Sequence, residues 1–323
     1  NSLGKTINKQ MPMSSVNRLA SNSTILKKNE KKAFGKTMVN TKAITVFLMN
    51  VKVTPNKAKR LEKDKRVKFS LEIISKDAFI KLRETSKGLF TEEFSKKIFS
   101  DDFKKQADSY KDMKQQLDKK INVPIYLDNL DIILKIIGIK VLNNLNPTLV
   151  KNLFEFLDSL YLIIFENKYK LNDIESHIII STLIDKLSLN NNTLREHSLS
   201  LLNQFIEYLD VNKIMVTVLN IALGKNSKIK SDILDLTTDL TMCQKLNVST
   251  KVYAKIFCKF LPINDNYIRS KTLNLFNEIY SNLGDELWNM IEVSEKDKEF
   301  LEQNLYKDNN EEEEEENENV EEK

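Results

Sequence analysis

The chain has 323 residues, of which 41% are hydrophobic, enough for one sizeable core or for the continuous core of a repeat array. Six Gly and five Pro leave little material for phosphate-binding loops, and Cys243 and Cys258 are too few for a disulfide framework or a zinc site. The composition therefore predicts an intracellular protein of long helices and short polar turns, without a cofactor. Its most apolar stretches, Leu130–Leu142 and Leu157–Phe165, are interrupted by charge or too short to span a bilayer, so we expect no membrane partner.

The net charge of +4 hides an uneven distribution along the chain. Residues 1–68 hold 17 Lys and Arg against 3 acids, residues 69–305 hold 31 against 33, and residues 306–323 hold 2 against 10. We therefore predict a basic, largely disordered linker over 1–65, a folded domain over 66–306 and an acidic disordered tail over 307–323. The first residue is Asn rather than Met, so we expect a piece of a longer protein.

The predicted elements begin with Ile44–Val53, an apolar, β-branched run, and Val67–Ile73, which alternates apolar and polar residues with period two. Each could be a short strand or an extended segment lying on the first helices. From Ser75 the apolar residues recur at helical spacing. The sequence then predicts the following helices: one from Ser75 or Asp77 to Phe99, one after Asp101 or Asp102 to Leu117, and then Pro124–Asn143, Thr148–Glu166, Asn172–Leu187, Thr193–Leu209, Asn212–Leu223, Lys228–Leu240, Ser249–Phe260, Tyr267–Asn282 and Ser294–Tyr306.

Four segments repeat one pattern, in which a polar turn precedes an apolar residue, usually a basic residue, and then an apolar helical stripe. They align at Val150, Arg195, Lys230 and Arg269, in steps of 45, 35 and 39 residues. A loose period of about 40 residues in a helical background is typical of HEAT repeats, whose helix pairs stack because no pair buries its own apolar face. The sequence thus predicts an all-α solenoid of about five to six helix pairs that offers a row of turns to a large partner.

The end of the predicted domain resembles a known family. The stretch RSKTLNLFNEIYSNLGDELW, from Arg269 to Trp288, followed by SEKDKEFLE from Ser294, is similar to the close of a TOG domain of the ch-TOG and Mini spindles family of microtubule polymerases. Arg66–Phe69, Leu89–Phe94 and Ile98–Phe103 resemble the start of the C-terminal TOG modules of that family. The resemblance covers about residues 66–306 and implies a HEAT-repeat paddle, in which the turns within the helix pairs line one edge and bind αβ-tubulin or the microtubule lattice, in the cytoplasm and on the cytoskeleton.

The same resemblance implies which residues contact tubulin, turn by turn. Phe103 represents the first turn, where tubulin-grasping modules commonly have Trp, and Val150 stands where the other repeats have a cation. The candidate set, which spans five turns, is Phe103, Asn146, Leu149, Asn192, Arg195, Lys228, Lys230, Asn266 and Arg269.

Some of these residues also have a purely structural interpretation. Arg195 and Arg269 could pair with an acid of a neighbouring repeat instead of a partner, and Leu149 fits a core position. Lys228 and Lys230 favour contact with a partner, because two cations in one turn bury poorly.

We expect no enzyme and no metal site, since His177 and His197 lack Cys or acids at ligand spacing. A HEAT or armadillo adaptor that binds a peptide or protein is the alternative function. A nucleic-acid-binding solenoid is less favoured, because the predicted domain has balanced charge rather than a basic excess.

Overall fold

The structure of the chain is a computed structural model, which describes residues 57–67, 76–141 and 144–305. The chain divides into two units, residues 1–46 and 47–323, and all the described residues belong to the second. The possible strand at 44–53 and the acidic tail lie outside the described residues, as does the possible strand at 67–73 apart from Val67.

Every named element in the described part of the chain is a helix, and the one β-bridge there, between Lys87 and Phe90, is isolated. The helices are α2 (Lys57–Val67), α3 (Lys76–Thr85), α4 (Glu92–Ile98), α5 (Phe103–Asp118), α6 (Val123–Asp128), α7 (Leu130–Val141), α8 (Pro147–Glu166), α9 (Asp173–Lys186), α10 (Asn192–Tyr208), α11 (Val211–Leu223), α12 (Ser227–Met242), α13 (Lys251–Phe257), α14 (Asn266–Leu283), α15 (Glu286–Met290) and α16 (Glu295–Leu305).

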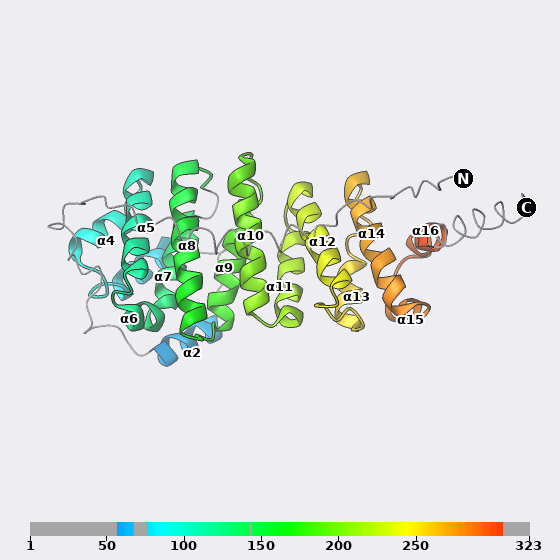
Figure 1. The fold of residues 1–323 in the computed structure, drawn as a ribbon, viewed down its shortest axis with the longest axis horizontal. Helices are drawn as coiled ribbons and strands as arrows, with labels where there is room; N and C mark the ends of the chain where they lie inside the picture. The colour runs from blue at the N-terminus through cyan, green and yellow to red at the C-terminus, as the bar shows by residue number, and fades with distance from the viewer. Residues whose placement is uncertain (1–56, 68–75, 142–143, 306–323) are drawn as a thin grey trace, which may run out of the picture. The chain divides into compact units, whose positions relative to one another are not determined.

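The helices of this unit form two layers (Figure 1). The first helices of successive pairs, α7, α9, α11 and α13, contact one another in sequence, and the second helices α5, α8, α10, α12 and α14 form the other layer. The first pair is α4 with α5, and α16 packs on α14 at the far end. This arrangement confirms the prediction of an all-α HEAT-type solenoid.

Each second helix begins at an Asn or Asp whose side chain accepts hydrogen bonds from backbone N–H groups of the first helical turn. Such a cap stabilises a helix by about 1 kcal/mol, because it satisfies donors that have no partner within the helix. The caps explain why the repeat pattern in the sequence starts with a polar turn. The five capping residues are Asp102, Asn146, Asn191, Asn226 and Asp265.

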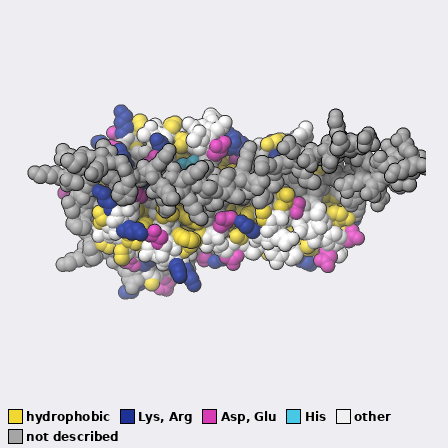
Figure 2. Space-filling view, viewed as in Figure 1, with side chains coloured by type: hydrophobic (Ala, Val, Ile, Leu, Met, Phe, Trp, Pro, Cys, Tyr) yellow, Lys and Arg dark blue, Asp and Glu magenta, His cyan; other side chains and the backbone are white. Residues whose placement is uncertain are grey.

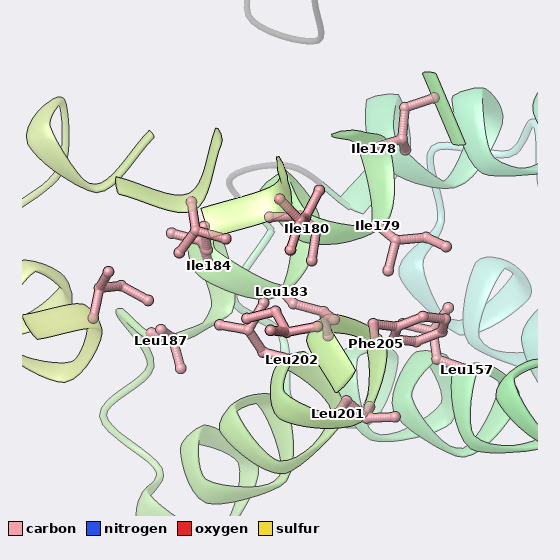
Figure 3. Close-up of a cluster of buried hydrophobic side chains, with 14 of the residues drawn as sticks. Leu157, Ile178, Ile179, Ile180, Leu183, Ile184, Leu187, Leu201, Leu202 and Phe205 are labelled. Atoms are coloured by element: carbon pink, nitrogen blue, oxygen red, sulfur yellow. The ribbon is translucent and has the colours of Figure 1, made fainter. Parts of the chain in front are cut away.

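The core runs between the two layers and continues from one repeat to the next. Figure 3 shows one part of it, where side chains of α8, α9 and α10 meet, among them Leu157, Leu183, Leu202 and Phe205, all at most 1% exposed. Outside the core the charge is mixed: on the face shown in Figure 2, acidic and basic side chains are interspersed over the described surface.

Two predicted helices are interrupted. The helix expected from Ser75 or Asp77 to Phe99 is divided into α3 and α4 by a turn in which Gly88 has φ 88°, a conformation that glycine adopts without a steric cost. The helix expected over Pro124–Asn143 is divided into α6 and α7 at Asn129, whose side-chain amide donates to the carbonyl of Ile125. Asn side chains compete in this way with the regular helical bonds.

The part of the predicted linker that the structure describes, from residue 57, forms α2. Two side chains of α2, those of Lys57 and Arg60, bind residues of α6, α7 and α9 and so hold α2 against these helices. Arg60 binds the fully buried Asp131 of α7 through Nε–Oδ2 at 3.0 Å and Nη2–Oδ1 at 2.8 Å. Lys57 Nζ contacts Glu175 of α9 at 2.6 Å and the carbonyl of Leu127 at 2.7 Å.

Candidate functional site

The turns within the helix pairs all lie at one edge of the two layers. Because each second helix runs antiparallel to its first helix, the N-terminal ends of α5, α8, α10, α12 and α14 point the same way and form the upper edge in Figure 1. We call this the turn edge, and define it as these five N-terminal turns with the residues that precede them. The opposite edge, formed by the connections between successive pairs, is the loop edge.

The same two positions face outward at the start of every second helix. The first and second helical residues are exposed in all five helices: Phe103 and Lys104, Pro147 and Thr148, Asn192 and Thr193, Ser227 and Lys228, and Asn266 and Tyr267. In α8, α10, α12 and α14 the third residue is buried and the fourth is buried or half-buried. A partner that approaches the turn edge therefore meets the first two residues of each second helix.

Three large apolar side chains are exposed on this edge. Phe103 is 37% exposed, Leu145 51% and Tyr267 59%. Leu145 and Tyr267 were missed by sequence reasoning, although Leu145 directly precedes the cap of α8 and Tyr267 lies off the apolar stripe of α14. Exposed aromatic side chains such as that of Tyr267 are common anchors for a protein partner.

Of the four cations in the candidate set, Lys228 is exposed and the other three are half-buried. The Nζ of Lys228 donates to the carbonyl of Leu189 at 3.2 Å. Lys230 is half-buried and lies near Asp265, the cap of the next second helix. The pKa of Asp265 is lowered, first by the hydrogen bond from the Ser227 hydroxyl and next by the backbone N–H of Ile268, and Lys230 adds a favourable charge interaction. Lys230 thus lies where one repeat meets the next.

The side chains of Arg195 and Arg269 also contact the element that follows their own repeat. The guanidinium of Arg195 makes a two-pronged ion pair with Asp232 of α12, with Nε–Oδ2 at 3.0 Å and a second bond from Nη2 to Oδ1. The guanidinium of Arg269 lies 4.3 Å from the ring centre of Phe300 in α16. Both arginines therefore join a repeat to the element that follows it.

Leu149 needs a correction as a contact residue, because its side chain is fully buried and cannot touch a partner. It takes the third helical position, which faces the core, as do Leu194, Ile229 and Ile268. Val150, at the position where the other repeats have a cation, is also fully buried. The absence of a cation there is thus explained by packing.

The three asparagines of the candidate set have different places. Asn146 is half-buried, and its side-chain oxygen caps α8 by accepting from the N–H groups of Thr148 and Leu149 at 3.0 and 3.2 Å. Asn192 and Asn266 are exposed first residues of α10 and α14, whose caps are the preceding Asn191 and Asp265. Asn192 and Asn266 therefore expose their side chains at the turn edge, whereas the side-chain oxygen of Asn146 already accepts hydrogen bonds.

A buried lysine fixes the second turn of the edge. Lys186 has no exposed surface, and its Nζ donates to the carbonyls of Val141 and Asn144 at 2.7 and 3.0 Å and to Asp185 at 2.8 Å. Burial lowers the pKa of Lys186, while Asp185 opposes that shift. Because Lys186 binds the end of α7 and the residue beside Leu145, it holds the apolar anchor of this turn in place.

The site has the chemistry of a contact surface. The described residues contain no cluster of three or more potential metal ligands, and none of their helices is both long and apolar enough to cross a membrane. His197 bonds to Asp158 of α8 at 2.9 Å and so joins neighbouring helices. The turn edge offers apolar side chains, amides and cations in a row to one extended surface.

Comparison with solved structures identifies the fold. Residues covering 80% of this chain match 99% of a structure described as "TOG-tubulin binding specificity promotes microtubule dynamics and mitotic spindle formation", with a TM-score of 0.67 and 20% identity. A match of similar extent, with a TM-score of 0.66 and 17% identity, is the TOG domain of Zyg9 from C. elegans. The domain therefore has the fold of a TOG domain, as the sequence predicted.

The sequence is similar to parts of two much longer proteins. It is 23% identical over 178 residues to the protein mini spindles of Drosophila melanogaster, and 24% identical over 153 residues to the protein MOR1 of Oryza sativa subsp. japonica. The matched regions include 55% and 45% of this chain but only 9% and 7% of those proteins. No family model matches the chain. The resemblance to the ch-TOG and Mini spindles family is confirmed, and the matched region spans less than a tenth of each relative's length.

Proposed function

We propose that this chain is a non-enzymatic TOG domain that binds αβ-tubulin or the microtubule lattice through its turn edge, within a microtubule-regulating protein of the polymerase type. The proposal rests on one repeated observation: the first two residues of every second helix are exposed on the same edge of the domain. The similar structure described in terms of TOG–tubulin binding, and the sequence relatives, support the same partner. A protein of this kind acts in the cytoplasm on microtubules, at the spindle or the centrosome.

The proposed contact has an apolar part and a charged part. Phe103, Leu145 and Tyr267 would bury apolar surface against the partner, and Lys228 would meet a carboxylate. Asn192 and Asn266 would supply amide hydrogen bonds at the positions beside these anchors. Tubulin is strongly acidic, so exposed cations would accelerate the encounter and form charge-assisted hydrogen bonds.

The fourth helical position, in contrast, serves the scaffold. Arg195, Lys230 and Arg269 are half-buried and face the following repeat. We infer that they set the spacing between turns, and thereby the alignment of the contact residues, without being the principal contacts themselves.

The test combines co-elution with tubulin in size-exclusion chromatography and sedimentation with microtubules. Tyr267→Ala and Phe103→Ala should each weaken binding by about 1–3 kcal/mol, a typical range for an aromatic anchor in an interface. The matched control is Leu162→Ala, which removes an apolar side chain of similar exposure from the loop-edge half of α8.

Thermal unfolding of each variant checks that the fold is intact. If wild type, Tyr267→Ala and Phe103→Ala bind tubulin equally strongly, the turn edge is not the tubulin contact. Loss of tubulin binding in Leu162→Ala instead would move the tubulin contact to the loop edge.

A further inference from the structure

An exposed aromatic patch lies at the loop edge, far from the turn edge. Near the C-terminal end of α8, Leu162 is 52% exposed and Phe165 59%. The ring of Phe165 lies 6.3 Å from that of Tyr161 and 6.4 Å from that of Tyr208 in α10. Since α8 has 20 residues, this patch is about 25–30 Å from the first turn of the same helix.

The patch continues into a cavity of about 640 Å³ between α9 and α11. Tyr208 belongs to both, and the cavity is further lined by Leu171, His177, Leu209, Ile214 and Thr217. Its volume is in the range of pockets that hold small ligands or a few peptide side chains. The hydroxyl of Tyr208 donates to the carbonyl of Tyr169 at 2.7 Å, so the ring that joins patch and cavity is held in one orientation.

The charges around this surface leave two cations uncompensated. Lys168 and Lys170 are exposed at the rim of the cavity, and neither has a carboxylate partner within the described residues. Two acids line the cavity and both are engaged, since Asp173 pairs with Lys213 at 2.7 Å and the carboxylate of Asp210 caps α11. Two acids nearby are paired as well, Glu166 with Lys120 at 2.8 Å and Glu207 with Lys245 at 2.7 Å.

We propose that this surface, formed by Leu162, Phe165, Tyr208, Lys168, Lys170 and the adjoining cavity, is a second binding site, which takes a short acidic peptide segment of another protein. An apolar or aromatic side chain of the peptide packs on Phe165 and enters the cavity, and its flanking carboxylates pair with Lys168 and Lys170. The preference for acidic flanks follows from the two unpaired cations, and the apolar anchor follows from the exposed rings. Both edges of the domain can then be occupied at once.

The test uses three labelled synthetic peptides and fluorescence anisotropy. The probe is the hexapeptide Glu-Glu-Leu-Phe-Glu-Glu; one control replaces its four Glu by Gln, and the other replaces Leu-Phe by Ala-Ala. We expect the probe to bind at least about fivefold more tightly than either control, and its affinity to fall with added salt.

Two variants locate the binding on the domain. Phe165→Ala and Lys170→Glu should each weaken probe binding at least about fivefold while tubulin binding is retained. Lys151→Glu, at the exposed turn-edge end of the same helix, and Lys228→Ala should leave probe binding unchanged. Thermal unfolding confirms that the substitutions leave the fold intact.

Three results would overturn the proposal of a peptide-binding site on this surface. The first is no binding of the probe up to about 1 mM, which corresponds to less than about 4 kcal/mol of binding free energy. The second is probe binding that survives both Phe165→Ala and Lys170→Glu. The third is a concentration-dependent dimer, seen by light scattering and abolished by Phe165→Ala, which would assign the patch to a second copy of this chain.

Discussion

Replacing Arg195 by Ala should destabilise the domain, although the residue belongs to the candidate contact set. Its guanidinium pairs with Asp232 through two hydrogen bonds, and the side chains are 27% and 11% exposed. Breaking a fully buried pair costs about 3–5 kcal/mol, because the remaining charge is left without compensation. Since Arg195 keeps some contact with solvent, we expect a smaller loss of about 2 kcal/mol here. For a domain of this size, that loss lowers the melting temperature by roughly 4–8 °C.

Lys228→Ala is the matched comparison. Lys228 is exposed on the turn edge one repeat further along, and its removal should change the unfolding free energy by less than about 0.5 kcal/mol. If Lys228 meets a tubulin carboxylate, the same substitution should lower tubulin affinity about tenfold, which corresponds to about 1.4 kcal/mol. Thermal unfolding and tubulin titration of both variants separate a residue of the scaffold from a residue of the contact.

The pH dependence of the Arg195→Ala defect provides a second check. Burial raises the pKa of Asp232 above its usual 3.8, and Arg195 opposes that shift. A carboxyl group whose pKa is higher in the folded than in the unfolded state lowers the free energy of unfolding at pH values above its folded-state pKa. This destabilisation is lost as the pH falls through the folded-state pKa toward the unfolded-state value, because the carboxyl becomes protonated. The defect should therefore be largest near neutral pH and shrink toward pH 4, and adding Asp232→Asn should recover most of it. Arg195→Ala with an unchanged melting temperature and lost tubulin binding would refute the scaffold role.

Three further predictions concern the supports of the two edges. Lys186→Met removes three hydrogen bonds of a buried ammonium and should cost about 2–4 kcal/mol of unfolding free energy in a denaturant titration; an unchanged midpoint would contradict the role of Lys186 in holding the second turn. Arg60→Ala removes the two-pronged partner of the fully buried Asp131 and leaves Lys135, at 4.0 Å, as its cationic neighbour among the described residues. Hydrogen exchange of α2 should therefore accelerate while that of α12 stays unchanged; equal protection of α2 in both proteins would show that Arg60 does not hold it. Residues 1–56 hold ten Lys and Arg against one acid, so their deletion should weaken sedimentation with microtubules most at low salt. A loss of sedimentation that does not depend on salt would exclude long-range electrostatic attraction as its cause.

The sequence predicted the solenoid well because its two strongest signals are local. Asn or Asp caps followed by an apolar stripe determine where each second helix begins, and the structure confirms these starts to within one or two residues. The breaks at Gly88 and Asn129 were missed, since one residue with a special backbone or side-chain bond interrupts an otherwise helical pattern. The contacts of α2 could not be predicted either, because Arg60 and Asp131 are 71 residues apart in the sequence.

The candidate site was harder to predict because successive residues of a helix differ in direction by about 100°. The four repeats were aligned on the residue that follows the repeated apolar position, and this is where Arg195, Lys230 and Arg269 face the next repeat. The residues that face outward precede this position by two or three places, and they vary in chemistry from Phe103 to Tyr267. Repeated chemistry in a solenoid thus reports first on the contacts between repeats. Recognition of a partner draws on the positions where the repeats differ, because each turn meets a different part of the partner's surface.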